Sequence, residues 1–106
     1  MSWTRLAGLK EIKDDACNIF ENTYGKILLV KLSGSDQFYA LSGVCPHEDY
    51  VLEDGFVQEG TIICPLHLSA FSLETGEVQN PPAEQSLESF AVKVENGSVF
   101  IKKKKN

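Results

Sequence analysis

The sequence predicts an all-β protein, an antiparallel β sandwich or small barrel that carries one inserted unit. Two observations predict the sheets: strand-length apolar runs recur with turn signals between them, and Asn96-Gly97 is the strongest two-residue signal for a hairpin. A third observation predicts the insertion, because the alternation of strands and turns breaks at Ser42-Gly43, just before the chain's only two histidines. A chain of 106 residues is enough for one domain.

Short strands are expected at both ends of the chain. The first part of the chain should contribute four of them, over residues 3–7, 16–21, 26–32 and 37–41. The run 26–32 is apolar without alternation, which predicts a central strand buried on both faces. Residues 90–95 alternate, so Phe90, Val92 and Val94 should point inward, and residues 98–101 should return as the last strand.

Two matching half-sites stand in the inserted unit. The first reads Cys45-Pro46-His47, and after sixteen residues the second reads Cys64-Pro65-Leu66-His67. Two sulfurs and two nitrogens can hold one tetrahedral zinc ion or a pair of irons bridged by sulfide. Zinc fingers usually pair like with like, whereas each half-site here mixes a thiolate with an imidazole, as a 2Fe–2S cluster with two histidines on one iron requires. The pattern favours the iron cluster and leaves zinc as the alternative.

At these residues the sequence resembles the Rieske family, whose pattern is Cys-x-His, a spacer, and Cys-x-x-His. The resemblance continues through residues 70–78 and 80–83 and covers nearly the whole chain. It implies the Rieske fold in a single domain, residues 1–106. The implied division is a base of residues 1–42 and 84–106 and a cluster-binding subdomain of about residues 43–83.

The resemblance also implies the cofactor and its ligands. One Rieske-type 2Fe–2S cluster is expected, with Cys45 and Cys64 on the inner iron and His47 and His67 on the outer iron. Respiratory Rieske subunits have an extra cysteine in each ligand loop, which form a disulfide together. The matching positions here hold Tyr50 and Leu66, as in the soluble ferredoxins.

Four further residues are expected around the cluster. Phe71 stands where respiratory members carry a hydrogen-bonding tyrosine, and fewer donors imply a potential in the lower part of the Rieske range of about −150 to +300 mV. Ser69 matches a serine that donates to a bridging sulfide in respiratory members, and its alternative role is to cap its own loop. Pro81 and Pro82 match a stiff loop that packs against the ligand loops.

Acidic residues follow the first half-site directly. Glu48 and Asp49 stand beside His47, where the resemblance places the electron exit, and they are candidates for contacts with a partner. Tyr50 and Leu68 would be the apolar contacts inside this acidic rim. Such a surface implies a basic partner face and attraction that weakens as salt rises, while the alternative is a loop that carries charge only for solubility.

Four protein ligands on two irons leave no open position for a substrate, and the chain has no phosphate loop or flavin fingerprint. The protein is therefore expected to pass one electron and not to be an enzyme. The resemblance implies the ferredoxin component of a multicomponent aromatic-ring oxygenase system in aromatic hydrocarbon catabolism. Its partners would be a flavin reductase that oxidises NAD(P)H and a terminal oxygenase. The small subunit of an assimilatory nitrite reductase and a zinc-stabilised interaction module are the alternatives.

Composition narrows the partners and the location. The net charge is −5, and without the lysines of residues 102–105 the remaining 15 acidic and 6 basic residues give −9, which argues against nucleic acid. The lysine run is expected to be a solvated tail, and Cys17 a small buried apolar residue. With no run of eighteen apolar residues and no signal-peptide core, we expect a cytoplasmic monomer with no membrane partner.

Overall fold

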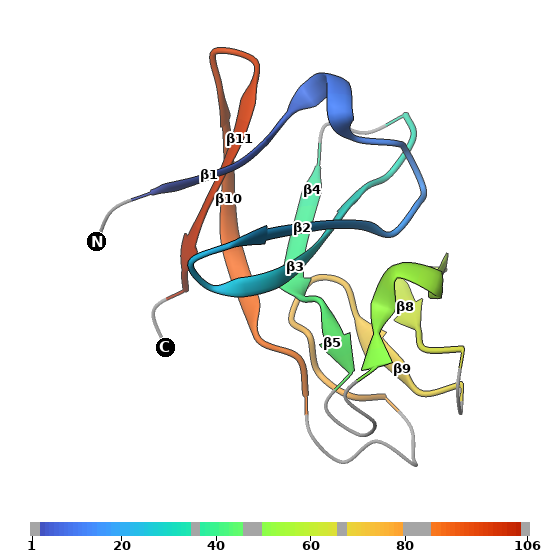
Figure 1. Ribbon diagram of the computed structural model, residues 1–106. Coiled ribbons are helices and arrows are strands. Elements are labelled where there is room, and N and C mark those ends of the chain that lie inside the picture. The colour runs from blue at the N-terminus through green and yellow to red at the C-terminus, as the bar shows by residue number, and fades with distance from the viewer. Residues whose placement is uncertain (1–2, 35–36, 46–49, 66–67, 80–85, 105–106) are drawn as a thin grey trace.

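The computed structural model describes residues 3–34, 37–45, 50–65, 68–79 and 86–104, and these form β-structure almost throughout (Figure 1). The all-β prediction is confirmed. Two short 3-10 helices lie among the strands, η1 (Leu9–Glu11) and η2 (Leu52–Asp54). The strands are β1 (Thr4–Gly8), β2 (Asn18–Asn22), β3 (Gly25–Lys31), β4 (Phe38–Ser42), β5 (Val44–Cys45), β6 (Tyr50–Val51), β7 (Phe56–Gln58), β8 (Thr61–Ile63), β9 (Ala70–Ser72), β10 (Ser89–Glu95) and β11 (Ser98–Lys103).

Six strands form one antiparallel sheet in the order β1-β11-β10-β4-β3-β2. The strands at the two ends of this order, β1 and β2, come into contact, so the sheet curls into a nearly closed barrel. The predicted hairpin joins β10 to β11. Asn96 has φ 51° and Gly97 has φ 76°, the two left-handed conformations that a type I′ turn requires.

The central strand β3 is buried on both faces, as its unbroken apolar run predicted. Leu28 and Val30 belong to one core cluster, and Ile27 and Leu29 belong to the other. The second cluster lies inside the barrel, and all of its buried members belong to the six-stranded sheet. Its buried members are Leu6, Ile27, Leu29, Ala40, Phe90, Val99 and Ile101.

The chain between β4 and β10 forms two small antiparallel sheets, β5-β6 and β7-β8-β9. They lie at one end of the six-stranded sheet, at the bottom of Figure 1. The first core cluster joins them to that sheet, because it combines side chains of β3 and β4 with those of the small sheets. Its buried members are Leu28, Val30, Leu41, Leu52, Ile62, Cys64, Phe71, Leu73 and Leu87.

Two expectations about the C-terminal hairpin were wrong. Val94 is not buried but 44% exposed, because it lies beyond Ser89 and Phe90, the two described residues at which β10 pairs with β4. The lysine run is not simply a tail, since β11 continues to Lys103. No helix of the described residues is long and apolar enough to cross a membrane.

Candidate metal centre

The first half-site begins where β5 ends. Cys45 is the last residue of β5 and pairs with Tyr50 of β6, while Val44 pairs with Val51. One residue beyond this ladder, the Leu52 N–H donates to the Gly43 carbonyl oxygen at 2.8 Å. The chain that follows Cys45 is therefore closed across its base by a two-stranded ladder. His47, Glu48 and Asp49 lie outside the described residues, as do His67 and Leu66 of the second half-site.

The second half-site begins directly after β8. The run Thr61–Ile63 consists of β-branched residues, which suits a strand held between β7 and β9. The Cys64 N–H then donates to the Ser69 carbonyl oxygen at 2.9 Å and closes the loop that leads back to β9. Both half-sites thus begin at a strand end and lie in a loop whose base is closed by backbone hydrogen bonds.

The surroundings of Cys64 fit a cluster ligand. Its side chain is only 2% exposed and packs in the first core cluster with Ile62, Phe71 and Leu73. Cys64 is not in a disulfide. A buried cysteine among apolar side chains suits a soft thiolate ligand of iron, because the apolar shell keeps water from the metal–sulfur bonds. This burial fits the inner-iron position that the resemblance to the Rieske family implies for Cys64.

Three more of the expected site residues lie within the described chain. Ser69 is the buried polar residue of the described part, at 1% exposure, and Phe71 is fully buried on β9 opposite Ile62 of β8. Leu68 differs sharply from both. It is 60% exposed, more than any other large apolar side chain described, and has φ 58°. Pro81 and Pro82 lie outside the described residues.

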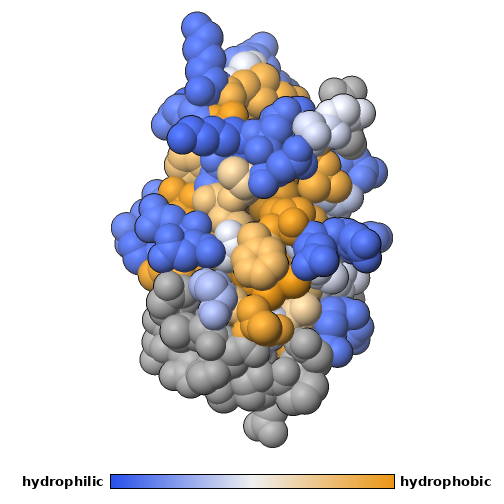
Figure 2. All heavy atoms as spheres, turned by 90° about the vertical axis from the view of Figure 1, so that its right-hand side faces the viewer, coloured by the Kyte–Doolittle hydropathy of each residue, from blue (hydrophilic) through white to orange (hydrophobic). Residues whose placement is uncertain are grey.

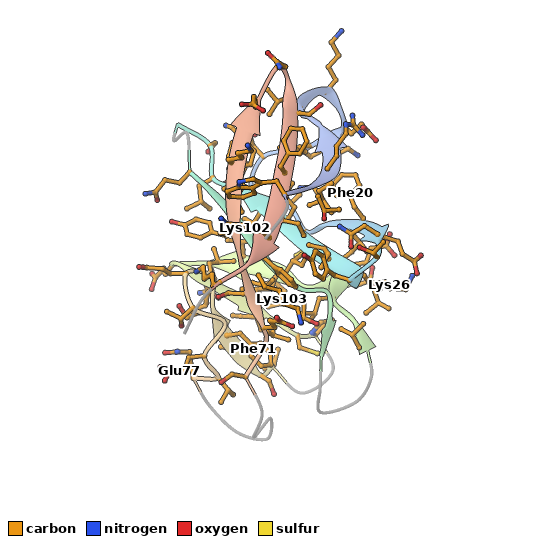
Figure 3. All side chains as sticks on the ribbon, turned by 90° about the vertical axis from the view of Figure 1, so that its left-hand side faces the viewer. Phe20, Lys26, Phe71, Glu77, Lys102 and Lys103 are labelled. Carbon is orange, nitrogen blue, oxygen red and sulfur yellow. The ribbon has the colours of Figure 1, made fainter. Side chains whose placement is uncertain are left out.

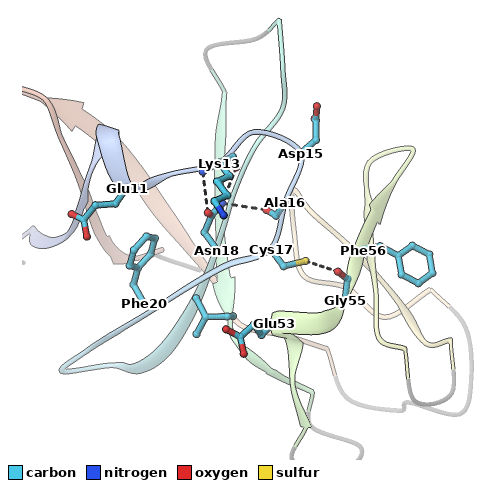
Figure 4. A pocket seen from close by; sticks show the side chains of 11 residues that line it. Glu11, Lys13, Asp15, Ala16, Cys17, Asn18, Phe20, Glu53, Gly55 and Phe56 are labelled. Atoms are coloured by element: carbon cyan, nitrogen blue, oxygen red, sulfur yellow. Dashed lines mark hydrogen bonds between the residues drawn. The ribbon is translucent and has the colours of Figure 1, made fainter.

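Cys17 links the six-stranded sheet to the small sheets, a role that the sequence did not predict. Its thiol donates to the Gly55 carbonyl oxygen at 3.1 Å (Figure 4). Gly55 in turn lies tightly against the chain that leads into Cys64, since a Cβ at Gly55 would be 2.9 Å from the Ile63 carbonyl oxygen. Partial burial raises the pKa of the Cys17 thiol to about 11, so the thiol stays protonated and keeps this hydrogen bond at neutral pH.

A hollow of about 530 Å³ lies beside this contact, between the start of β2 and the η2–β7 turn (Figure 4). Phe56, 45% exposed, lines one side, and Ile19 and Phe20 line the other. Apolar side chains form a band between hydrophilic ones on this side of the molecule (Figure 2). The carboxylates of Glu11, Asp15 and Glu53 stand at the edge of the hollow.

The family of the chain follows from comparison with known proteins. The model of the Rieske [2Fe-2S] domain matches residues 2–91. The ferredoxin component of the alkene monooxygenase system of Xanthobacter autotrophicus is 35% identical over 102 residues, which are 95% of this chain and 81% of that protein. The chain therefore belongs to the Rieske [2Fe-2S] family. Its cofactor is a Rieske-type 2Fe–2S cluster.

Other similar proteins extend this comparison. Human apoptosis-inducing factor 3 is 34% identical over 97 residues, but the chain spans only 16% of its length. Among solved structures, a chain in the complex of reduced oxygenase and oxidized ferredoxin of carbazole 1,9a-dioxygenase is 25% identical with a TM-score of 0.83, covering 98% of this chain and 96% of that one. A nitrite reductase small subunit from Mycobacterium tuberculosis shares the fold, with 19% identity, a TM-score of 0.80, and coverage of 94% of this chain and 93% of that one.

Proposed function

We propose that this chain is the ferredoxin component of an oxygenase system. It takes single electrons from a flavin reductase that oxidises NAD(P)H and delivers them to a terminal oxygenase in the cytoplasm, as a soluble monomer. One observation carries the proposal: the similarity to the alkene monooxygenase ferredoxin extends over 95% of this chain and 81% of that protein. The similarity to a chain from an oxygenase–ferredoxin complex supports the same kind of partner.

The proposed cluster ligands are Cys45 and Cys64 on the inner iron and His47 and His67 on the outer iron. The burial of Cys64 and the closed bases of both half-site loops support this assignment. The bound cluster supplies the one-electron chemistry. The chain itself contributes the thiolates and imidazoles, and the apolar side chains around Cys64 exclude water. We place this site in a cluster-binding subdomain of about residues 43–83, on a base of residues 1–42 and 84–106 of one domain.

Leu68, next to the proposed ligand His67, is the described residue best suited to contact the oxygenase. Exposure of a leucine is unfavourable in water, and its left-handed backbone conformation is uncommon for a residue other than glycine, asparagine or aspartate. Strained conformations of this kind gather at functional sites. We propose that Leu68 forms an apolar contact at the electron exit, with Tyr50, Glu48 and Asp49 completing the docking surface.

The test begins with capture of the cluster-loaded protein's partners from the cells that make it. A flavoprotein and an oxygenase are expected, and the flavoprotein with NAD(P)H should reduce the cluster by one electron per two irons. Leu68→Asn should slow electron transfer to the captured oxygenase while the potential and the reduction by dithionite stay unchanged, because asparagine tolerates the left-handed conformation. Phe56→Asn, at another exposed apolar residue, is the control.

The small subunit of a nitrite reductase is the second candidate. Its support is the shared fold, which at 19% identity carries no statement about function. The two Cys/His half-sites favour the electron carrier, since a subunit without redox work has no need of four cluster ligands. Capture of the large subunit of a nitrite reductase, with no oxygenase, would overturn the proposed function.

A further inference from the structure

A groove opens between β4 and β10, beyond the two residues of β4, Leu41 and Ala40, that pair with β10. These two residues pair with Ser89 and Phe90, and beyond them the described residues of β4 and β10 form no further ladder pairs. The groove measures about 380 Å³, and a second hollow of about 200 Å³ continues it along the same strands. The residues that line the first part are Gln37, Phe38, Tyr39, Val92, Lys93 and Val94.

The backbone edges on either side of the groove are suited to accept a strand. Ser42 donates its N–H to the Glu88 carbonyl oxygen across this seam at 2.8 Å. Peptide groups along a strand alternate in direction, so every second residue from there, including Phe38 in β4 and Val92 and Val94 in β10, turns its peptide groups toward the groove. Edges of this kind pair readily with an extended segment of another chain.

The side chains of the groove are apolar and incompletely covered. Val94 is 44% exposed, and Phe38, Tyr39 and Val92 are half-buried. Phe38 and Val92 pack against the second core cluster, so the floor of the groove is continuous with the core. An added strand would cover Val94 and extend the apolar contacts of the barrel.

Three lysines, Lys93, Lys102 and Lys104, lie at the rim of the groove and outnumber the nearby carboxylates, Glu95, which is 3.7 Å from the Lys93 Nζ, and Glu74, which lines the second hollow. The Lys93 Nζ lies 4.9 Å from the centre of the Trp3 ring and 5.6 Å from the centre of the Phe100 ring. The Lys102 Nζ lies 4.7 Å from the centre of the same Trp3 ring. Lys104 lines the second hollow and donates to the Glu74 carbonyl oxygen at 3.1 Å. Cation–π contacts hold Lys93 and Lys102 on the face of β10 and β11, where Lys102 and Lys103 are visible in Figure 3.

We propose that this groove binds an extended acidic segment of a protein partner, which adds to β10 as a strand. The rim lysines fit acidic side chains, the apolar floor fits alternate apolar ones, and the peptide groups that face the groove fit the backbone. A membrane or a nucleic acid fits less well, because either extends beyond the rim lysines, and its negative charge would be repelled by the rest of a protein whose net charge is −5. No lining residue comes from residues 43–69, so the site is separate from the proposed electron exit and goes beyond the proposed function.

The probe is a seven-residue peptide of alternating glutamate and valine, added to the cluster-loaded protein. Trp3 is the chain's single tryptophan and contacts both rim lysines, so its fluorescence reports on this site directly. The acidic peptide should change the Trp3 emission in a saturable way and bind more weakly as salt rises. The same peptide with N-methyl groups along one backbone edge should lose the binding, because it cannot form a ladder.

Matched variants separate the groove from general charge. Lys93→Gln and Lys102→Gln should each weaken peptide binding about two- to five-fold. Lys26→Gln, which removes a lysine that is likewise paired with a glutamate but lies on β3, should leave it unchanged. All three variants should keep the visible spectrum and the midpoint potential of the cluster. A loss of peptide binding can therefore be distinguished from a loss of the proposed electron-transfer function.

Several results would overturn the proposal. One is no change in Trp3 emission at about 1 mM peptide in low salt, the weak end of specific binding. Equal binding of the N-methylated peptide, or an equal loss in Lys26→Gln, would show simple charge attraction. Tighter binding to phosphatidylglycerol vesicles or to an RNA oligomer, or self-association of the protein through this face, would assign the groove to a different occupant.

Discussion

Ser69 offers a measurable link between one hydroxyl and the redox potential. Its side chain is buried in the loop that starts at Cys64, which suits the hydrogen bond to a bridging sulfide that its match with respiratory Rieske proteins implies. Such a bond stabilises the reduced state more, because that state carries one more negative charge. Ser69→Ala should lower the midpoint potential by roughly 20–60 mV, if about a third to a half of a charged hydrogen bond of roughly 1.5–3 kcal/mol differs between the states.

Protein-film voltammetry of both forms measures this shift, with the visible spectrum as the check that the cluster is intact. Ser72→Ala is the control, because Ser72 lies on β9 and its hydroxyl accepts from the Thr75 N–H. An unchanged or higher midpoint potential in Ser69→Ala would show that the hydroxyl caps the backbone of its own loop instead of donating to a sulfide.

Cys17 should be unusually slow to react with alkylating reagents. Burial raises the pKa of its thiol from about 9 to about 11, and the thiolate is the reactive form. At pH 8 the thiolate fraction is then about 100-fold lower than for an ordinary cysteine, and the rate should rise with pH until about 11. Iodoacetamide labelling of the native cluster-loaded protein, followed by mass spectrometry of the Cys17 peptide, measures this. Labelling at the rate of a free thiol at pH 8 would contradict the raised pKa.

At the scale of single residues, the sequence predicted features that depend on residues close together in the chain. The Cys/His half-sites are specified by neighbours two or three residues apart, and the family that they indicated is the one whose model matches the chain. The contact of Cys17 with Gly55 joins residues 38 apart in sequence, and no local pattern encodes it. The left-handed conformation of Leu68 was also unpredictable, because it depends on how its loop closes between Cys64 and Ser69.

Among the structural elements, the turn after β9 tests how closely the small sheets are joined to the base. Gly76 accepts from the Leu87 N–H at 2.7 Å, and a Cβ at Gly76 would collide with the Leu87 carbonyl oxygen. Gly76→Ala should therefore destabilise the protein by about 1–3 kcal/mol more than Gly60→Ala. Gly60 is a matched control, since it has the same φ of 79° and no atom near its Cβ position.

Thermal unfolding of the two cluster-loaded variants, followed by circular dichroism, compares them. Equal apparent melting temperatures would mean that the β9 turn can move away from Leu87 without cost.

Element prediction succeeded where local pattern and turn chemistry agreed. The Asn96-Gly97 hairpin and the two-faced strand β3 are examples, because the first is set by two φ angles and the second by composition. The strands β5, β6 and β7 were not predicted, since pieces of two or three residues are too short for a period. Val94 was placed wrongly because alternation reports the face of a strand but not whether a neighbouring strand covers it.

For the molecule as a whole, loss of the cluster should affect the two ends of the protein unequally. The buried members of the second core cluster all belong to the six-stranded sheet, whereas small sheets of two and three short strands are not stable by themselves. Because metal binding contributes to folding free energy, removal of iron should speed amide hydrogen exchange in β5–β9 first. Exchange in β10, β11 and the β2–β3 pair should remain slow.

Hydrogen exchange with mass spectrometry on the iron-free and cluster-loaded forms measures this difference, and reloading with iron and sulfide should reverse it. Uniform acceleration across all strands would show that the two core clusters unfold as one unit.

The two-faced burial of β3 has a consequence for how its alignment is specified. A strand with one polar face resists sliding, because a slip of one residue would expose its apolar side chains. In β3 a slip would exchange Ile27 and Leu29 for Leu28 and Val30, aliphatic side chains of similar volume, so the strand itself holds little information about its own alignment. That information lies in the hairpin before it, where the Asn22 side chain accepts from the Tyr24 N–H at 2.8 Å and Gly25 turns the chain at φ 96°. The four-residue turn of residues 22–25 thus determines which side chains enter each of the two buried cores.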